Sequence, residues 1–586
     1  MRKSMLRKLS AAIKVTGLSL FVHGFTSTQA LAQDIVQIAN SDPLIITGVI
    51  GTNNTYYHSN MGNGYRSPMS NVFYANLNIS LYGISMPFSF YYSNDNTQFS
   101  HPQFSFNLNP KYKHWTGYIG QSSMEYSSYV LGMSFNGVGV EYNDEKHWRF
   151  GAFYGVLRKA VNDDPNDPYA RTPEYKRVGW GFKVGYTSGN NYVDLYVLRA
   201  LDRLKSLDEY WQQRVSPMEN IAIGLKGGVR PLKWFSLSGN LAASMFSTDT
   251  RVEKVETPEA DKWSSVFDTR YSSMARFAGD VAATFTAGNL LSTSIVYRLV
   301  QPDYTSLGAY YMSNNYHSFG MTASSTPITN LSLTGTFSFQ SDTLTNKQLY
   351  TTKGYIYSLM ASSRINDFLN ISAGYNGYTQ VQSDGTAKVN DTTRVDRIMQ
   401  SFYLTPSATF DGAALSHSIS LTGSITDNKD RNPFATGESD VTSKAIGLAY
   451  SMGVKSWETD FSGNLNYQVS DGYKTRYKSS VATLGVSRSF LKEKELNIGL
   501  NFSLCYNEVE KQSKSLSLGA DLSASYMLKK VHSFSLAAGM SKYGDVNQTR
   551  RRSSLDALDI TASLNYTYTF TLLEIRKKAA KAAAER

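Results

Sequence analysis

Two short stretches of the chain carry side chains that could bind a metal ion. His114 and His147 both stand in the tripeptide Lys-His-Trp, where a pair of imidazoles could ligate a metal. The run from Asn162 to Asp167 has enough oxygen ligands for calcium, but it lacks the glycine and the closing glutamate of a known calcium loop. Histidine beside tryptophan also suits a membrane interface, and an acidic run suits a solvated outer loop. We therefore expect no metal site and no cofactor.

The nucleophilic and basic side chains also give no sign of a catalytic site. Cys505 lies in an alternating stretch, so we expect it to pack as a neutral thiol rather than act as a nucleophile. Serines are so abundant that a nearby histidine proves nothing, and we expect no catalytic residues and no enzyme. Three adjacent arginines could contact lipopolysaccharide phosphates bidentately, or could simply keep an outer loop soluble. They are Arg550, Arg551 and Arg552.

The composition excludes several classes of protein. The chain has 586 residues, of which 18% are charged and 13% are aromatic. So many large apolar side chains argue against disorder, and a single cysteine rules out a disulfide scaffold. The formal charge of +11 is concentrated in the first 32 residues, which hold five bases, and in the tail, which holds five bases and two acids. The body is therefore nearly neutral, and we expect no nucleic-acid partner.

The first 32 residues have the organisation of a secretory signal peptide. A basic start precedes an apolar stretch from Val15 to Phe25, and Ala30-Leu31-Ala32 supplies a cleavage site before Gln33. The apolar stretch is too short for a membrane span of about 20 residues. Only about ten residues then precede the first strand near Pro43, which leaves no room for an N-terminal plug.

The stretches of chain that must position these residues alternate between apolar and polar side chains, with a period of two. In residues 73–81, 331–340 and 558–570, apolar side chains occupy every second position and polar side chains fill the others. This period predicts β-strands. The strands run for about 9 to 15 residues, a length that suits tilted strands crossing a membrane. After residue 32 no apolar run approaches the roughly 18 residues of a membrane helix.

Short turn signals recur along the whole body. Together with a first and a last strand they predict about 26 strands, within a range of roughly 22 to 28. Strands in lipid must pair on both sides, so we expect one all-β, antiparallel transmembrane barrel with both termini in the periplasm. Residues 1–32 would be the signal peptide, 33–570 the barrel and 571–586 a basic periplasmic tail. The twelve turn signals lie near Gly83, Pro110, Asp144, Gly189, Pro231, Gly288, Thr329, Asn366, Gly412, Lys455, Lys492 and Lys530.

Four tryptophans support this arrangement. Each follows a proposed turn closely, which predicts an aromatic girdle at one membrane surface. Chance placement in a tyrosine-rich chain is the alternative. The four residues are Trp115, Trp148, Trp234 and Trp457.

The last strand ends in alternating aromatic residues, Tyr566, Tyr568 and Phe570. This ending resembles the C-terminal signal that outer-membrane assembly machinery recognises, although here sixteen residues follow it. The alanine- and lysine-rich tail could form a short helix or remain a disordered basic end.

The longest candidate outer loops are residues 159–174, 201–218 and 247–270. The last of them mixes charges of both signs, so it could fold inward and narrow the lumen, or it could be a solvated surface loop.

Four stretches in the first part of the chain, residues 87–94, 109–115, 148–161 and 181–202, resemble large outer-membrane β-barrel proteins of Bacteroidota. The resemblance implies a barrel in the outer membrane and supplies no catalytic or ligand residues. We expect a pore or translocation conduit for solutes or a partner. The alternative is a structural or docking component of an envelope complex, its lumen filled by a lipoprotein or a periplasmic plug protein.

Overall fold

The computed structural model describes residues 44–62, 66–94, 104–164, 171–258, 264, 266–309, 312–342, 344, 348–545 and 557–575. The expected signal peptide and its cleavage site lie outside these residues. Three short helical turns interrupt the described strands: η1 (Leu204–Ser206), α3 (Glu209–Gln212) and η2 (Lys455–Trp457). No helix in the described part of the chain has the length and apolar character needed to cross a bilayer.

Strands form where the sequence alternates, because alternate side chains then face opposite environments. The first half of the sheet contains β1 (Leu44–Ser59), β2 (Met69–Leu81), β3 (Ile84–Ser93), β4 (Phe104–Leu108), β5 (Lys111–Tyr112), β6 (Trp115–Ser122), β7 (Phe135–Asn143), β8 (Trp148–Arg158), β9 (Arg177–Ser188), β10 (Asn191–Asp202), β11 (Glu219–Leu232), β12 (Phe235–Ser247), β13 (Ser273–Ala287) and β14 (Leu291–Val300).

The second half has longer and more regular strands. These are β15 (Tyr316–Ile328), β16 (Leu331–Ser341), β17 (Tyr350–Arg364), β18 (Leu369–Asp384), β19 (Asp396–Asp411), β20 (Leu415–Asp430), β21 (Val441–Val454), β22 (Thr459–Gly472), β23 (Thr475–Phe490), β24 (Leu496–Val509), β25 (Ser513–Leu528), β26 (His532–Asp545) and β27 (Ala557–Ile575).

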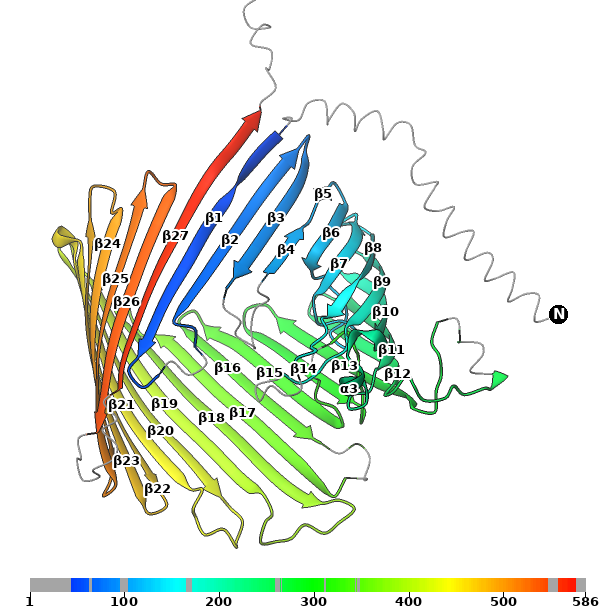
Figure 1. Ribbon diagram of the computed structural model, residues 1–586. Coiled ribbons are helices and arrows are strands. Elements are labelled where there is room, and N and C mark those ends of the chain that lie inside the picture. The colour runs from blue at the N-terminus through cyan, green and yellow to red at the C-terminus, as the bar shows by residue number, and fades with distance from the viewer. Residues whose placement is uncertain are drawn as a thin grey trace, which may run out of the picture.

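The sheet closes on itself. β1 pairs antiparallel with β2 on one side and with β27 on the other, and Figure 1 shows β1 and β27 side by side. β4 and β5 share one position, because both lie between β3 and β6. Counted as one interrupted strand, they make a closed antiparallel barrel of 26 strands. The predicted fold class and strand number are confirmed.

Short turns join the strands at one end of the barrel, which we call the turn end; the opposite end is the loop end. At the turn end Tyr82 and Gly83 have φ angles of 49° and 83°. This is the type I′ geometry that matches the twist of paired strands. Leu44 pairs with Ile575, so the described ends of the chain also lie at the turn end. Every predicted turn falls at or beside one of these connections.

The outer surface of the barrel is apolar. Phe73, Leu241 and Leu564 are 46%, 51% and 48% exposed, and each alternates with a polar neighbour that faces the lumen. Large apolar side chains exposed around a closed sheet require a lipid environment, because water would make such a belt aggregate. The barrel is therefore a transmembrane one.

The largest buried cluster lies inside the barrel, against the inner wall of β7–β14. It contains side chains from two loops as well as from the strands. Its members are Met124, Tyr126, Tyr129, Val130, Leu131, Met133, Phe135, Phe153, Tyr196, Leu198, Ala222, Ala242, Ala278, Val300 and Tyr304.

Candidate functional site

A loop folded into the lumen forms the centre of this cluster. Residues 123–134, which we call the first infolded loop, join β6 to β7 at the loop end. Val130 is completely buried, and Tyr129 and Leu131 are nearly so. Tyr126 packs edge-on against Phe153 of β8, with ring centroids 5.7 Å apart. The loop therefore fills part of the lumen with an apolar core.

Residues 301–315, the second infolded loop, join β14 to β15 and dock on the first. Gly132 donates its backbone N–H to the carbonyl of Gly308 at 3.0 Å. The Tyr304 hydroxyl donates to the carbonyl of Tyr129 at 2.9 Å. Burial raises the pKa of Tyr304, so its hydroxyl remains a donor at physiological pH. The two loops thus form one packed unit.

Hydrogen bonds fasten this unit to the inner wall. The Tyr129 hydroxyl donates to Asp280 Oδ1 of β13 at 2.6 Å. Ser127 donates to Asn240 Oδ1 of β12 at 2.7 Å. Measured against water, a hydrogen bond of this kind contributes about 0.5–1.5 kcal/mol, and one to a carboxylate about 1.5–3 kcal/mol, so the wall helps to hold the loops in place.

Glycines on the inner face of β8, β9 and β11 make room for the first infolded loop. A Cβ atom at Gly224 would lie 2.7 Å from Val130 Cγ2, and one at Gly151 would lie 2.8 Å from Met124 Cε. A side chain at Gly224 would displace Val130 of the loop, whereas one at Gly151 would displace the flexible ends of Met124 and Lys183.

An ion-pair cluster near the loop end holds the second infolded loop. Arg177 Nε and Nη2 donate to Asp202 Oδ1 and Oδ2 at 2.8 and 3.1 Å. Their side chains are 8% and 1% exposed. Arg177 also donates to the carbonyl of Leu307 at 3.4 Å. The bidentate pair with Asp202 holds the planar guanidinium of Arg177 in one orientation, and in that orientation the guanidinium also bonds the second infolded loop.

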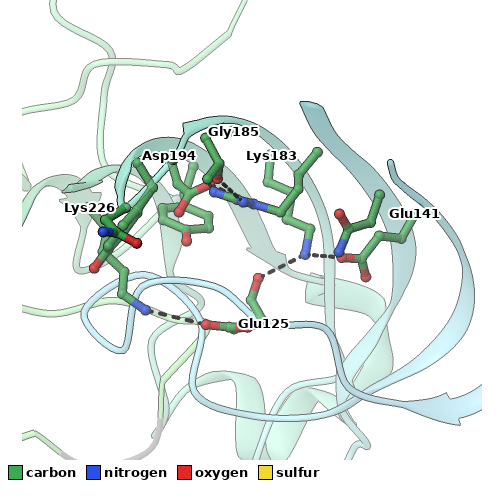
Figure 2. Close-up of a pocket in the computed structure, with 13 residues that line it drawn as sticks. Glu125, Glu141, Lys183, Gly185, Asp194 and Lys226 are labelled. Atoms are coloured by element: carbon green, nitrogen blue, oxygen red, sulfur yellow. Dashed lines mark hydrogen bonds and ion pairs between the residues drawn. The ribbon is translucent and has the colours of Figure 1, made fainter. Parts of the chain in front are cut away.

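A charged pocket of about 380 Å³ lies beneath the first infolded loop, toward the turn end of β7–β11. Figure 2 shows Glu125 reaching it from the loop, opposite side chains of the wall. Lys183 Nζ lies 2.7 Å from Glu141 Oε1, and Lys226 Nζ lies 3.3 Å from Glu125 Oε1. On β8 and β10, Arg149 Nη2 lies 2.8 Å from Asp194 Oδ1. We call this cavity the charged pocket.

The charges in this pocket balance. Three acids face three bases, and each is in an ion pair, so the charged pocket offers no unpaired anion or cation to a solute. Within the described residues, no three His, Cys, Asp or Glu side chains gather as metal ligands. The pocket can hold water and polar solutes against the wall, and its geometry suggests no reaction.

The inner wall of β15–β27 has a different character. Asn464, Asn466 and Gln468 of β22 point inward and are exposed. Asp521 and Ser523 of β25 are exposed in the same way. Of the described hydrophobic residues after Leu307, Val454 alone is buried. No packed plug of described residues covers this wall.

The four tryptophans all lie at the turn end. Trp115 and Trp148 begin β6 and β8, Trp234 is in the turn before β12, and Trp457 ends η2. All four are exposed. Trp115 and Trp148 each pack against a neighbouring tyrosine, with ring centroids 4.9 Å apart in both cases.

The aromatic ending of β27 packs on β26. Tyr566 lies 4.8 Å from Phe534 between ring centroids, and Tyr568 lies 4.6 Å from His532. Phe570 continues the row, 5.1 Å from Tyr568. β27 runs on to Ile575, so the barrel wall extends beyond the expected boundary at residue 570. The tail after residue 575 lies outside the described residues.

The other candidate side chains are distributed around the barrel. His114 Nδ1 lies 3.1 Å from the Asn143 carbonyl, while His147 packs on Tyr186. In the acidic run Asp163 forms hydrogen bonds with Arg171, which hold the pKa of Asp163 down to about 2. The arginines 550–552 and residues 165–167 lie outside the described part of the chain.

The expected constriction candidate, residues 247–270, lies at the rim in its described part. Thr250 donates its backbone N–H to the Pro217 carbonyl at 2.9 Å, and Arg251 hydrogen-bonds Ser216 at 3.2 Å. The shorter loops fold inward instead. The sequence signal for them is the run of alternate glycines along β7–β9, which leaves space on one inner wall.

No protein-family model matches the chain, and no curated protein matches it. Similar solved structures include the P pilus usher (PapC) translocation pore, with 10% identity, a TM-score of 0.36, and coverage of 90% of this chain and 100% of that one. OccAB2 of Acinetobacter baumannii has 10% identity and a TM-score of 0.30, and the match covers 61% of this chain and 93% of that one. OccK1 (OpdK) of Pseudomonas aeruginosa has 10% identity and a TM-score of 0.32, and the match covers 61% of this chain and 92% of that one. At these scores the fold assignment rests on the strand pairing itself.

Proposed function

We propose that the chain is a bacterial outer-membrane barrel that acts as a pore or translocation conduit for solutes or for a partner. The observation that carries this proposal is the contrast between the two walls of the lumen. Infolded loops fill the side along β7–β14, whereas polar side chains on β15–β27 remain exposed. A wall of this kind is hydrated, so solutes would pass along it.

The proposal includes an orientation. The turn end would face the periplasm together with both termini, because short turns lie on that side of bacterial barrels. The exposed tryptophans would then form a girdle at the periplasmic interface. Arginines 550–552 would meet lipopolysaccharide phosphates on the opposite surface. The assembly machinery would read the aromatic ending of β27 during insertion.

Single-channel recording of the purified barrel in a planar bilayer tests the proposal. We expect discrete current steps from protein that mass spectrometry shows to be free of copurifying partners. The same protein, heat-unfolded before reconstitution, should give none and serves as the control. Partner-free, folded protein without conductance would contradict the proposal.

A structural or docking component of an envelope complex is the second candidate. The exposed wall of β15–β27 favours it as well, because a polypeptide partner could cover those polar side chains. A lipoprotein or periplasmic partner present at one copy per barrel after gentle extraction would support this function. A partner bound in the lumen would also explain a purified barrel that conducts only after that partner has been removed.

A further inference from the structure

A second cavity, of about 600 Å³, lies where the barrel closes. Its side chains come from β27, β1, β2, β3, β4 and β6, and we call it the seam pocket. Cross-strand partners share a face, so the register arranges the inward side chains in rows. The rows are Asn107, Ser89 and Asn76; then Ser105, Tyr91 and Tyr74; then Val72, Asn53 and Asn565.

The seam pocket is polar but carries no formal charge. No Lys, Arg, His, Asp or Glu lines it, in contrast to the charged pocket. A neutral lining gives an ionic solute no partner for its charge, so burial against it would be unfavourable. Amide groups dominate instead, and each amide both donates and accepts hydrogen bonds. The amides are those of Asn53, Asn76, Asn107, Gln121 and Asn565.

Two tyrosines occupy the centre of the seam pocket. Tyr74 and Tyr91 are direct cross-strand partners on β2 and β3. The Tyr74 ring lies across Gly51 of β1, since a Cβ atom there would be 2.5 Å from Tyr74 Cζ. The ring therefore rests against the wall, with its other face toward the lumen. A flat aromatic face beside amides suits a ligand with both C–H faces and hydroxyl edges.

One amide in the seam pocket is incompletely bonded. Asn565 Oδ1 is buried and has no hydrogen-bond partner. Buried acceptors in proteins are normally satisfied, and an exception indicates a group that a solvent molecule or a ligand completes. A rotation of the Asn565 amide would present this acceptor, or its NH2 group, to a molecule in the cavity.

From these observations we infer that the seam pocket binds a neutral, polyhydroxylated solute, a sugar chain. Each hydroxyl can donate to one amide oxygen and accept from another amide's NH2 group. The sugar's C–H face would pack on Tyr74. The inference rests on the proposed function in one respect: a conduit would carry such a solute past this wall.

Titration calorimetry on the full-length chain in detergent tests the inference. Maltohexaose and hexa-N-acetylchitohexaose serve as neutral probes, and a hexamer of galacturonic acid serves as the charged one. We expect at least one neutral hexamer to bind, with the charged hexamer weaker by about tenfold or more. Equal affinity for the charged hexamer, or no binding of either neutral one, would overturn the inference.

Variants locate the binding. Asn76→Ala should weaken the affinity for the neutral hexamer about tenfold, since one hydrogen-bonding group that the bound sugar would cover is lost. Tyr74→Ala should weaken it further, and Tyr74→Phe, which keeps the ring, should weaken it less. Asn464→Ala removes an inward amide of β22 outside the pocket and is the matched control. Affinity unchanged in Asn76→Ala, in protein with the gel mobility of a folded barrel, would also overturn the inference.

The same probes separate this inference from the proposed function. If the barrel conducts and the neutral hexamers neither bind nor interrupt the current, the sugar site is wrong and the conduit stands. If a neutral hexamer binds at the seam pocket and the partner-free barrel does not conduct, the conduit is wrong and the site stands.

Discussion

Truncation of Tyr304 should loosen the infolded loops and change the current through the barrel. The side chain is 1% exposed, and its ring packs edge-on against Tyr129 with centroids 6.4 Å apart. Its hydroxyl also donates to the Tyr129 carbonyl. Replacing a buried aromatic side chain by alanine costs about 3–5 kcal/mol. At 1.4 kcal/mol per factor of ten, the ratio of docked to undocked loops should fall by roughly 10² to 10³ or more.

Single-channel recording measures this change directly. Tyr304→Ala should give larger current steps or frequent excursions to a larger level, because the undocked loops no longer narrow the lumen. Tyr304→Phe keeps the ring and removes one hydrogen bond, so about 1–3 kcal/mol is lost and the effect should be smaller. A folded Tyr304→Ala barrel with the amplitude and noise of the wild type would refute the idea that these loops narrow the passage.

Three further perturbations test other parts of the structure. Gly224→Leu should destabilise loop docking by about 1–3 kcal/mol through overpacking, measured as increased protease cleavage of the infolded loops. Phe337→Arg, at an outward position in the middle of the spanning sheet, should lower the folding free energy in lipid vesicles by about 2–4 kcal/mol, while Ser338→Arg, on the lumen face, should cost less; equal losses would reverse the assignment of faces. The contact between Asp163 and Arg171 should persist from neutral pH to about pH 4 and weaken toward pH 2, because the folded pKa of the Asp163 carboxyl lies below its unfolded value. Its loss should appear as faster proteolysis of that loop, and cleavage already increased at pH 5 would contradict it.

The fold was predictable because the membrane enforces a simple pattern. Outward positions must be apolar and inward ones polar, so residues 331–340 reveal the two faces of β16 from sequence alone. Turns such as the one at Tyr82 and Gly83 are short and use residues that adopt positive φ. The periodicity and the turn spacing together therefore predicted the strand number.

The interior was harder to predict. The sequence leaves residues 247–270 open to an inward or a solvated position, and it does not single out residues 123–134 and 301–315, which fill the lumen. Six of the twelve residues of the first infolded loop are apolar or aromatic. The sequence alone does not show which surface such a loop covers, because that surface is built from strands far away in the chain. That surface consists of alternate glycines such as Gly151 and Gly224, whose significance depends on contacts with residues far away in the chain.

The seam pocket and the charged pocket were also missed, for a related reason. Their residues come from strands that closure of the barrel brings together, such as Asn53 and Asn565 on the first and last strands. The alternation of the sequence shows that the side chains of the two pockets face inward. Only the register of the strands shows which of them become neighbours.

Labelling of the single cysteine tests the central claim, that the wall of β15–β27 lines an open, hydrated passage. Cys505 is on β24, in an inward position between Asn501 and Asn507 and only partly buried. In the folded, partner-free barrel a charged, water-soluble methanethiosulfonate reagent should label Cys505, and the single-channel current should fall as it does. Cys505→Ser is the control and should show neither effect. A thiol that reacts only after the barrel is unfolded, or labelling that leaves the current unchanged, would contradict a passage along this wall.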